Sequence, residues 1–371
     1  MPTRDFQPSK IAPRLRLLLS AIAFSTAAMP ATANPRIVVD VASGRVIEHE
    51  DAFRKWYPAS LTKLMTAYTT FRALKAGELT LESVVTMSKR AAAEPASKTY
   101  FTPGSKLTLD SALKIMLVKS ANDIAVAVGE TVGGGSINAF VARMNAEAAR
   151  LGMGSSHFIN ANGLPGPGQY STARDLAILS VAIRREFPQY ANYFSLEGIS
   201  TGKKQYPNYN LLIGRFDGAD GMKTGFICAS GFNQISSATR NGRTVLTVVL
   251  GAESLGARAD ISADLLQKAL TTAPATSTTL ATLAPYGADR DVVADISAEV
   301  CNPKAAQVRS ESRDEAGRMK MHSAYIHEMG RPPVVSFAGL LPGSEVAANT
   351  TVGPKGEQIA NVPIPIPRPT F

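Results

Sequence analysis

The strand-like segments of this 371-residue chain fall into two groups, and a mostly helical stretch separates them. Near the start, Arg36–Asp40 and Val46–His49 are short runs of strand-forming residues joined by a turn-like segment, which predicts a hairpin. Further strand-like runs follow at Met222–Ile227, Phe232–Ala238 and Thr244–Leu250. This order predicts an α/β fold of the α+β type. We expect an antiparallel sheet built from both chain ends, flanked by helices, with an inserted helical region between the two groups of strands.

Apolar residues recur every three or four positions after Pro58, which predicts a long helix that ends near Gly77. The recurring positions are Leu61, Leu64, Met65, Tyr68 and Phe71. Further helices are expected at Leu109–Val118, at Ile124–Val132 and, after the last strand, at Ala259–Leu270. The pair Asn241-Gly242 lies between the last two predicted strands and is a strong hairpin signal.

Residues 1–33 have the pattern of a secretory signal peptide. Arg14 and Arg16 precede the apolar run Leu17–Phe24, and Ala31-Thr32-Ala33 matches the small-x-small cleavage pattern. The apolar run is far shorter than the ~20 residues that span a bilayer, which disfavours a membrane anchor. We therefore expect export to the periplasm or cell envelope, with cleavage after Ala33.

The chain has a formal net charge of +9, and the predicted signal peptide carries +3 of it, so about +6 remains after cleavage. The basic residues form no dense cluster, and nucleic acid is therefore not an expected partner. A solvated basic surface and attraction to an anionic cell envelope both agree with this charge. The two cysteines, Cys228 and Cys301, can pair in an oxidising compartment, but the sequence leaves two free thiols equally open.

The composition changes after residue 270. Thr271–Thr282 is rich in Thr, Ala, Ser and Pro, and Val362–Thr370 alternates apolar residues with proline. We therefore predict three parts: the signal peptide 1–33, one folded domain at 34–270, and a linker with a Pro-rich, largely unstructured tail at 271–371. Some local order is expected near Val334–Leu341.

Three short motifs occur in order along the chain: Ser60-Leu61-Thr62-Lys63, Ser120-Ala121-Asn122 and Lys223-Thr224-Gly225. Each motif alone is weak, and Ser-x-x-Lys also occurs at Ser111–Lys114 and Ser200–Lys203. Only the first Ser-x-x-Lys begins a predicted helix and precedes both other motifs at domain-scale distances. The ordered set, rather than any single motif, therefore indicates a catalytic site.

The residue types in these motifs fit nucleophilic catalysis. Ser60 and Lys63 are three residues apart on a predicted helix, so their side chains share a face. A serine hydroxyl needs a neighbouring base, and a lysine can be that base if burial and nearby positive charge, here Lys223, lower its pKa. The backbone N–H groups of Ser60 and Phe226 can form an oxyanion hole. Gly225 would allow the substrate backbone to approach closely.

Simpler structural roles compete with each motif. Ser60 and Lys63 can be a helix-start serine with an exposed lysine, and Ser120 can be the N-cap of the helix at Ile124. Lys223-Thr224-Gly225 can be the end of a strand before a turn. No Cys/His spacing suggests zinc, and we expect no metal and no cofactor.

Longer stretches around the motifs resemble the low-molecular-mass penicillin-binding proteins, specifically the serine-type D-alanyl-D-alanine carboxypeptidases. The resemblance is carried by Tyr57–Thr66, Lys119–Asp123, Asp217–Gly225, Phe158–Leu164 and Ser171–Asp175, and it covers roughly residues 35–270. The short motifs Ser-x-x-Lys and Lys-Thr-Gly are typical of penicillin-binding proteins and of class A β-lactamases alike, so the longer stretches are the more specific signal. The resemblance implies a β-lactamase/transpeptidase-like fold.

The resemblance also implies roles for the motif residues. Ser60 would attack the penultimate D-alanine carbonyl of a peptidoglycan stem peptide, with Lys63 as general base and Ser120 in proton transfer to the leaving amine. Asn122 would orient Lys63 and the substrate amide. The residues implied in substrate binding are Asn122, Lys223, Thr224, Gly225, Phe226 and, as a further candidate for the substrate carboxylate, Arg258. β-Lactams would acylate the same serine as covalent inhibitors.

Two departures from the family pattern stand out. Many relatives carry histidine where this chain has Phe226, which affects the expected substrate preference or deacylation rate. Many also carry a second, all-β domain that ends in an amphipathic membrane helix, and the Pro-rich end here has no such pattern, so membrane anchoring stays open. If Cys228 and Cys301 pair, the bridge would hold the tail beside the site.

Other functions stay open on the same fold. A D,D-endopeptidase uses the same residues, and a β-lactamase needs a carboxylate that activates the deacylating water. No Glu-x-x-Leu-Asn-like segment occurs between Ser120 and Lys223, which disfavours the β-lactamase. A non-catalytic envelope-binding protein would not need the intact motifs.

Overall fold

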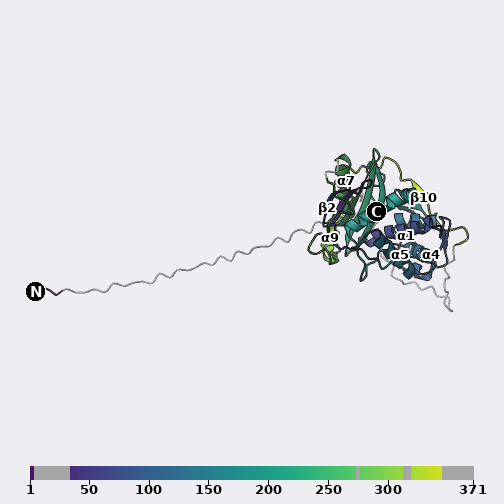
Figure 1. Ribbon diagram of the computed structural model, residues 1–371, viewed down its shortest axis with the longest axis horizontal. Helices are drawn as coiled ribbons and strands as arrows, with labels where there is room; N and C mark the ends of the chain where they lie inside the picture. The colour runs from purple at the N-terminus through teal and green to yellow at the C-terminus, as the bar shows by residue number, and fades with distance from the viewer. Residues whose placement is uncertain (4–33, 273–275, 312–318, 345–371) are drawn as a thin grey trace. The chain divides into compact units, whose positions relative to one another are not determined.

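The computed structural model describes residues 1–3, 34–272, 276–311 and 319–344 (Figure 1). The predicted signal peptide, apart from its first three residues, and the Pro-rich segment Val362–Thr370 lie outside the described residues.

A five-stranded antiparallel sheet forms the centre of the domain, with strand order β2-β1-β9-β8-β7 (Figure 1). Its strands are β1 (Arg36–Asp40), β2 (Val46–Glu50), β7 (Ala219–Ile227), β8 (Gly231–Arg240) and β9 (Arg243–Ala252). Strand β1 pairs with β9, with Arg36 opposite Val249, so the two ends of the predicted sheet are joined as expected. Asn241 and Gly242 both have positive φ, 50° and 75°, in the tight turn between β8 and β9.

Helices cover both faces of this sheet and form the inserted region. In chain order they are the 3-10 turn η1 (Ala59–Leu61), α1 (Thr62–Lys75), α2 (Lys89–Ala93), α3 (Leu109–Val118), α4 (Asn122–Val132), α5 (Ile137–Arg150), α6 (Ala173–Glu186), the 3-10 turn η2 (Pro188–Phe194), α7 (Leu255–Thr271), α8 (Ser297–Val300) and α9 (Pro303–Glu311). Two small sheets complete the described part: β3 (Val84–Thr86) with β4 (Lys106–Thr108), and β5 (Gly198–Ser200) with β6 (Gln205–Pro207) and β10 (Val335–Phe337).

Side chains of β1 alternate between two apolar cores, as the period of a strand requires. Ile37 and Val39 lie in the large core that the sheet shares with α1, α3, α4 and α6. Val38 lies in a smaller core on the opposite face, together with Ala259, Leu266 and other residues of α7. The predicted combination of a two-ended sheet, flanking helices and an inserted helical region is therefore confirmed.

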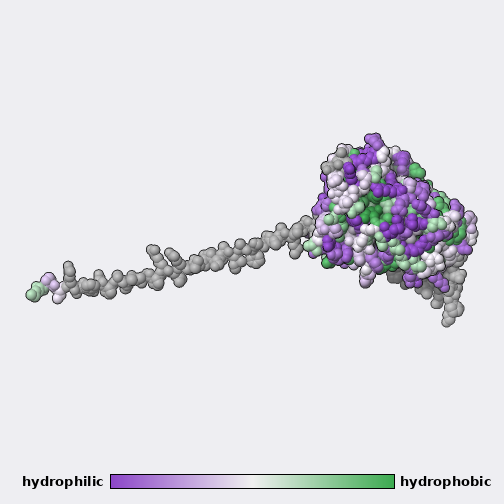
Figure 2. All heavy atoms as spheres, viewed as in Figure 1, coloured by the Kyte–Doolittle hydropathy of each residue, from purple (hydrophilic) through white to green (hydrophobic). Residues whose placement is uncertain are grey.

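Within the described ranges, no single helix is long and apolar enough to cross a membrane; α4 and α5 meet that condition only together, as a pair bent by 87°. Figure 2 shows that polar residues dominate the visible face, with apolar residues in scattered patches, which is the usual state of a folded surface.

The stretch after α7 differs from our expectation. Residues 276–311 and 319–344 pack on the domain, so the prediction of a linker and largely unstructured tail is wrong for these two stretches. Leu280, Ala294, Val300 and Ala338 are each buried. The polar composition of these stretches did not indicate that they are ordered, because a few apolar residues can hold a segment in place when they pack on a core that other segments form. The local order expected near Val334–Leu341 is confirmed by β10, which pairs in parallel with β5.

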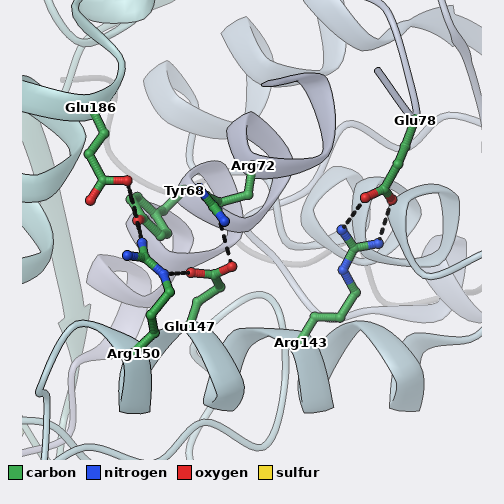
Figure 3. A network of polar contacts seen from close by, with 7 residues as sticks. All are labelled: Tyr68, Arg72, Glu78, Arg143, Glu147, Arg150 and Glu186. Atoms are coloured by element: carbon green, nitrogen blue, oxygen red, sulfur yellow. Dashed lines mark hydrogen bonds and ion pairs between the residues drawn. The ribbon is translucent and has the colours of Figure 1, made fainter. Parts of the chain in front are cut away.

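A network of polar side chains joins α1 to α5 and α6 (Figure 3). The Tyr68 hydroxyl of α1 donates to Glu186 of α6 at 2.8 Å and accepts from Arg150 of α5. Glu147 of α5 accepts from Arg150 and from Arg72, at 2.6 Å and 3.1 Å. Burial raises the pKa of Tyr68, so its hydroxyl stays a donor. The network ties α1, which carries the Ser-x-x-Lys lysine, to two other helices.

We predict that Tyr68→Phe lowers the free energy of unfolding by about 1–2 kcal/mol, because a buried hydroxyl bonded to charged partners is lost while the ring remains. Urea denaturation measures this loss. Tyr325→Phe, at an exposed tyrosine, is the matched control and should stay within about 0.5 kcal/mol of the wild type. Equal unfolding midpoints for the two variants would contradict the prediction.

Candidate active site

Ser60 lies in η1, at the point where the chain turns into α1. Ala59 before it has a φ of 47°, which is uncommon for a residue with a side chain. Gly163 passes beneath this turn with a φ of +88°, so close that an added Cβ would lie 1.8 Å from the Ala59 carbonyl oxygen. Ser60 is partly exposed, whereas Lys63, one turn later, is completely buried. The predicted helix start is confirmed, and the alternative of an exposed lysine is wrong.

The Lys63 amine lies among three oxygen acceptors. It donates to Ser60 Oγ at 3.0 Å, to Asn122 Oδ1 at 2.8 Å and to the Asn162 carbonyl oxygen at 2.6 Å. Burial lowers the pKa of Lys63 to about 7, although the carboxylates of Asp123 and Glu94 oppose the shift. Near neutral pH, a substantial fraction of this amine is therefore neutral and able to take the Ser60 proton.

Ser120 and Lys223 form a second lysine–serine pair in the same site. Lys223 Nζ donates to Ser120 Oγ at 2.9 Å and to the Thr224 carbonyl oxygen at 2.9 Å, and both side chains are buried. Burial and the neighbouring charges of Lys63 and Arg258 lower the pKa of Lys223 well below its usual value. The two polar side chains of the motif therefore contact different lysines: Ser120 contacts Lys223, and Asn122 contacts Lys63.

The alternative role of Ser120 as a helix N-cap is wrong. Helix α4 begins at Asn122, its cap position is Ala121, and the cap makes no side-chain hydrogen bond. Ser120 itself has a φ of 61°, which turns its side chain out of the helix and toward Lys223.

Gly225 places the edge strand β7 directly against η1. A Cβ at this position would lie 3.0 Å from Ser60 N, 3.1 Å from the Pro58 carbonyl oxygen and 3.2 Å from Leu61 N. We expected Gly225 to let the substrate approach β7 closely. It instead lets β7 approach the backbone of η1, the turn that carries Ser60 and that we call the serine turn. The strand that carries Lys223 and Thr224 is held beside the Ser60 backbone N–H by this contact.

Phe226 follows Gly225 on β7, and its side chain is 41 % exposed. Its ring packs on Phe232 of β8, with ring centroids 4.2 Å apart. The predicted oxyanion hole uses the backbone N–H groups of Phe226 and Ser60, and Gly225 brings the two segments together. That role stays a prediction.

Arg258, the remaining candidate, lies buried on α7 behind the strand. Its guanidinium donates to the backbone carbonyls of Gly225 and Asn233, both at 3.3 Å, and of Tyr209 at 3.1 Å. These contacts support the strand that carries the Lys-Thr-Gly motif. Binding of the substrate carboxylate by Arg258 stays a prediction, and none of these contacts favours it.

Sequence reasoning missed three residues that surround Lys63: Asn162, Glu94 and Asp123. Asn162 lies in Phe158–Leu164, which contributed to the family resemblance but had no assigned role. Asp123 follows Asn122 within another stretch of the resemblance, and no role follows for it from the sequence. Glu94 lies outside every motif, so no sequence signal could have identified it.

Residues 290–301, which we call the strap, bind the segment before Ser60 and the segment after β7. Strap residues exchange backbone hydrogen bonds with Lys55, just before the serine turn, and with Ala229, just after β7: Lys55 N to Arg290 O at 3.0 Å, Ala294 N to Lys55 O at 3.1 Å and Ile296 N to Ala229 O at 3.1 Å. At its end, Cys301 forms a disulfide with Cys228. The bridge that we considered from sequence is therefore present and holds the strap beside the site.

Among the described residues, no group of His, Cys, Asp and Glu is arranged to hold a metal ion.

Comparison with known proteins agrees with this fold and site. The sequence pattern of the D-alanyl-D-alanine carboxypeptidase family matches residues 22–254. This chain therefore belongs to that family of low-molecular-mass penicillin-binding proteins. The D-alanyl-D-alanine carboxypeptidase DacC of Escherichia coli is 35% identical over 237 residues, which cover 62% of this chain and 59% of DacC. The chain thus spans about three fifths of the length of this curated relative.

Solved structures confirm the predicted transpeptidase-like fold. The D-alanyl-D-alanine carboxypeptidase DacD of Francisella tularensis superposes with a TM-score of 0.62 at 29% identity, over 72% of this chain and 74% of that one. Penicillin-binding protein D2 of Listeria monocytogenes, solved in an ampicillin-bound form, gives 0.56 at 29% identity, over 64% of this chain and 96% of that one.

We predict that Gly225→Ala lowers the rate of Ser60 acylation about 10- to 100-fold, because an added methyl group must push β7 away from the serine turn. Labelling with a fluorescent penicillin over time measures this rate. Gly154→Ala is the control, since an added Cβ there has no neighbour within 4 Å. Acylation of the Gly225→Ala variant at the control rate would show that the close approach is not needed.

We also predict that replacing both Cys228 and Cys301 by serine lowers the free energy of unfolding by about 2–4 kcal/mol, since the bridge closes a long loop between cysteines with a sequence separation of 73. Urea denaturation with and without reductant tests this. Reductant should destabilise the wild type by a similar amount and leave the double variant unchanged. A wild type that reductant does not affect would contradict the prediction.

Proposed function

We propose that this protein is a serine-type D-Ala-D-Ala carboxypeptidase that removes the terminal D-alanine from peptidoglycan stem peptides through an acyl-enzyme on Ser60. The observation that carries the proposal is the contact of Ser60 Oγ, 3.0 Å away, with the amine of a fully buried Lys63. A serine next to a lysine of lowered pKa is an activated nucleophile. Membership of the D-alanyl-D-alanine carboxypeptidase family supports the substrate.

Acylation follows from this geometry. Neutral Lys63 takes the Ser60 proton as Oγ attacks the carbonyl carbon of the penultimate D-alanine. Negative charge develops on the carbonyl oxygen, and the backbone N–H groups of Ser60 and Phe226 stabilise it. Asn122 holds the Lys63 amine in line through its Oδ1 oxygen, 2.8 Å away.

Departure of the terminal D-alanine needs a proton on its amine nitrogen. Ser120 is suited to pass this proton, because its hydroxyl accepts from Lys223, while Asn122, two residues later, accepts from Lys63. The carbon–nitrogen bond then breaks and leaves an ester on Ser60. Lys223 and Thr224 hold the carboxylate of the leaving residue, and water later hydrolyses the ester.

We further propose that β-lactams acylate Ser60, since they mimic the D-Ala-D-Ala end. The ampicillin-bound form of the Listeria relative supports the binding of β-lactams. We place the enzyme outside the cytoplasm, in the periplasm or cell envelope, with a role in cell wall biogenesis and cell shape. The predicted signal peptide and the Cys228–Cys301 disulfide support this location, because disulfides persist in oxidising compartments.

One experiment tests the proposed function. The protein is incubated with a pentapeptide that ends in D-Ala-D-Ala, and free D-alanine is assayed for the wild type and for Ser60→Ala. We expect release by the wild type alone, together with a stable fluorescent-penicillin adduct that Ser60→Ala lacks. Rapid turnover of the adduct would favour a β-lactamase, and cleavage of cross-linked dimers without D-alanine release would favour an endopeptidase. No labelling of the wild type would overturn the catalytic proposal.

We predict that the acylation rate rises with pH through about 7 and then levels off, because only the neutral form of Lys63 can accept the proton and its pKa is about 7. Below that pH the rate should fall about tenfold per unit. Penicillin labelling between pH 5 and pH 9 measures the profile. A rate that still rises about tenfold per unit up to pH 9 would contradict the assignment of a buried base, because an ordinary lysine has a pKa of about 10.4.

A further inference from the structure

Glu94 lies two hydrogen bonds from the amine of Lys63. It follows α2, and its Oε2 oxygen accepts from Asn162 Nδ2 at 2.8 Å. The backbone carbonyl of the same asparagine accepts from Lys63 Nζ at 2.6 Å. Glu94 therefore holds Asn162, whose carbonyl oxygen makes the shortest of the three hydrogen bonds of the Lys63 amine.

Charged groups face Lys63 from three elements. Asp123 comes from α4, Lys223 comes from β7, and Glu94 comes from the segment after α2. The two carboxylates favour protonation of Lys63, and its burial opposes it; Lys63 in turn disfavours protonation of Lys223. Arg258 adds positive charge beside Lys223. The protonation of Lys63 is therefore a balance between the two carboxylates and the cost of burial.

The two carboxylates differ in what else they do. Asp123 is fully buried, and its oxygens accept from the backbone and hydroxyl of Thr99, at 2.7 Å and 2.6 Å, and from the backbone of Ile124 at 2.9 Å. It fixes the start of α4. Glu94 is only partly buried, and its hydrogen bond runs to the asparagine that contacts Lys63. Glu94 is thus placed to act on Lys63 without holding a helix in place.

We propose that Glu94 is a positioning residue for the catalytic base, which fixes Asn162 against Lys63 and supplies a negative charge that favours the protonated amine against the cost of burying it. The inference rests on the proposed function, in which Lys63 is the base. A base works best when its pKa is near the working pH, and a fully buried amine without a nearby negative charge would become too weak a base. Burial raises the pKa of the Glu94 carboxyl, while Asn162 and Lys63 favour its ionised form.

The experiment compares pH profiles of acylation by a fluorescent penicillin for the wild type, Glu94→Gln, Glu94→Asp and Glu82→Gln. Glutamine keeps an oxygen that can accept from Asn162 but removes the charge. We expect the midpoint of Glu94→Gln to fall by about one pH unit, because an attractive charge near Lys63 is lost. Glu94→Asp should keep the wild-type midpoint. Glu82→Gln removes the same charge from an exposed site and should match the wild type.

The midpoint of the profile does not depend on the fraction of folded protein, so partial instability of a variant does not obscure the result. A Glu94→Gln midpoint equal to that of Glu82→Gln would overturn the inference while leaving the proposed function intact. Absence of acylation in the wild type would instead overturn the proposed function, and with it any role for Glu94 in that reaction.

Discussion

The burial of one lysine amine is the constraint on which the site depends. A charged amine without partners is costly to bury, so Lys63 must either find acceptors or give up its proton. The protein does part of both: three oxygens surround the amine, and its pKa falls to about 7. The backbone segments that carry these oxygens must in turn be held close to the amine. Gly163 lets the loop of Asn162 fit beneath the serine turn, and the turn at Ser120 directs Asn122 inward. The unusual backbone angles of the site are therefore consequences of enclosing this amine.

The sheet and the helical region each provide half of this arrangement. Lys63 and Asn122 come from the inserted helices, whereas Lys223 and Gly225 come from the edge strand β7. The contact between Gly225 and the serine turn joins the halves, and the polar residues of the Ser120 turn contact a lysine from each. Burial lowers the pKa of both lysines, and the charges of Lys63 and Arg258 lower that of Lys223 further.

Local sequence patterns predicted the helices and strands well. They predicted site residues only where the residue types of the three motifs and the order of those motifs along the chain pointed to the same chemistry. Helix α3 has the predicted bounds, and the hairpin at Asn241-Gly242 forms, because periodicity and turn chemistry act within a few residues. The roles of Ser120 and Glu94 depend on partners far along the chain, Lys223 and Asn162, and no local pattern contains that information. The same reason explains the segment after α7. Its polar composition indicated a tail, but Leu280 and Val300 find their apolar surroundings on surfaces that other segments supply.

The pairing of β1 with β9 has a consequence for the order in which the molecule is made. Arg36 lies opposite Val249, so the first strand waits for the last one before the central sheet can close. Contacts this distant in sequence form late, because a long loop must first be closed. β7, β8 and β9 can pair with one another as sequence neighbours, but until they are made Lys63 has neither Lys223 beside it nor a complete core around it. An amine in water is protonated at neutral pH and cannot act as a base. A growing chain would therefore already contain Ser60 and Lys63 but have no reactive serine, and reactivity would arise only when the strand that carries Lys223 and the core around Lys63 are in place.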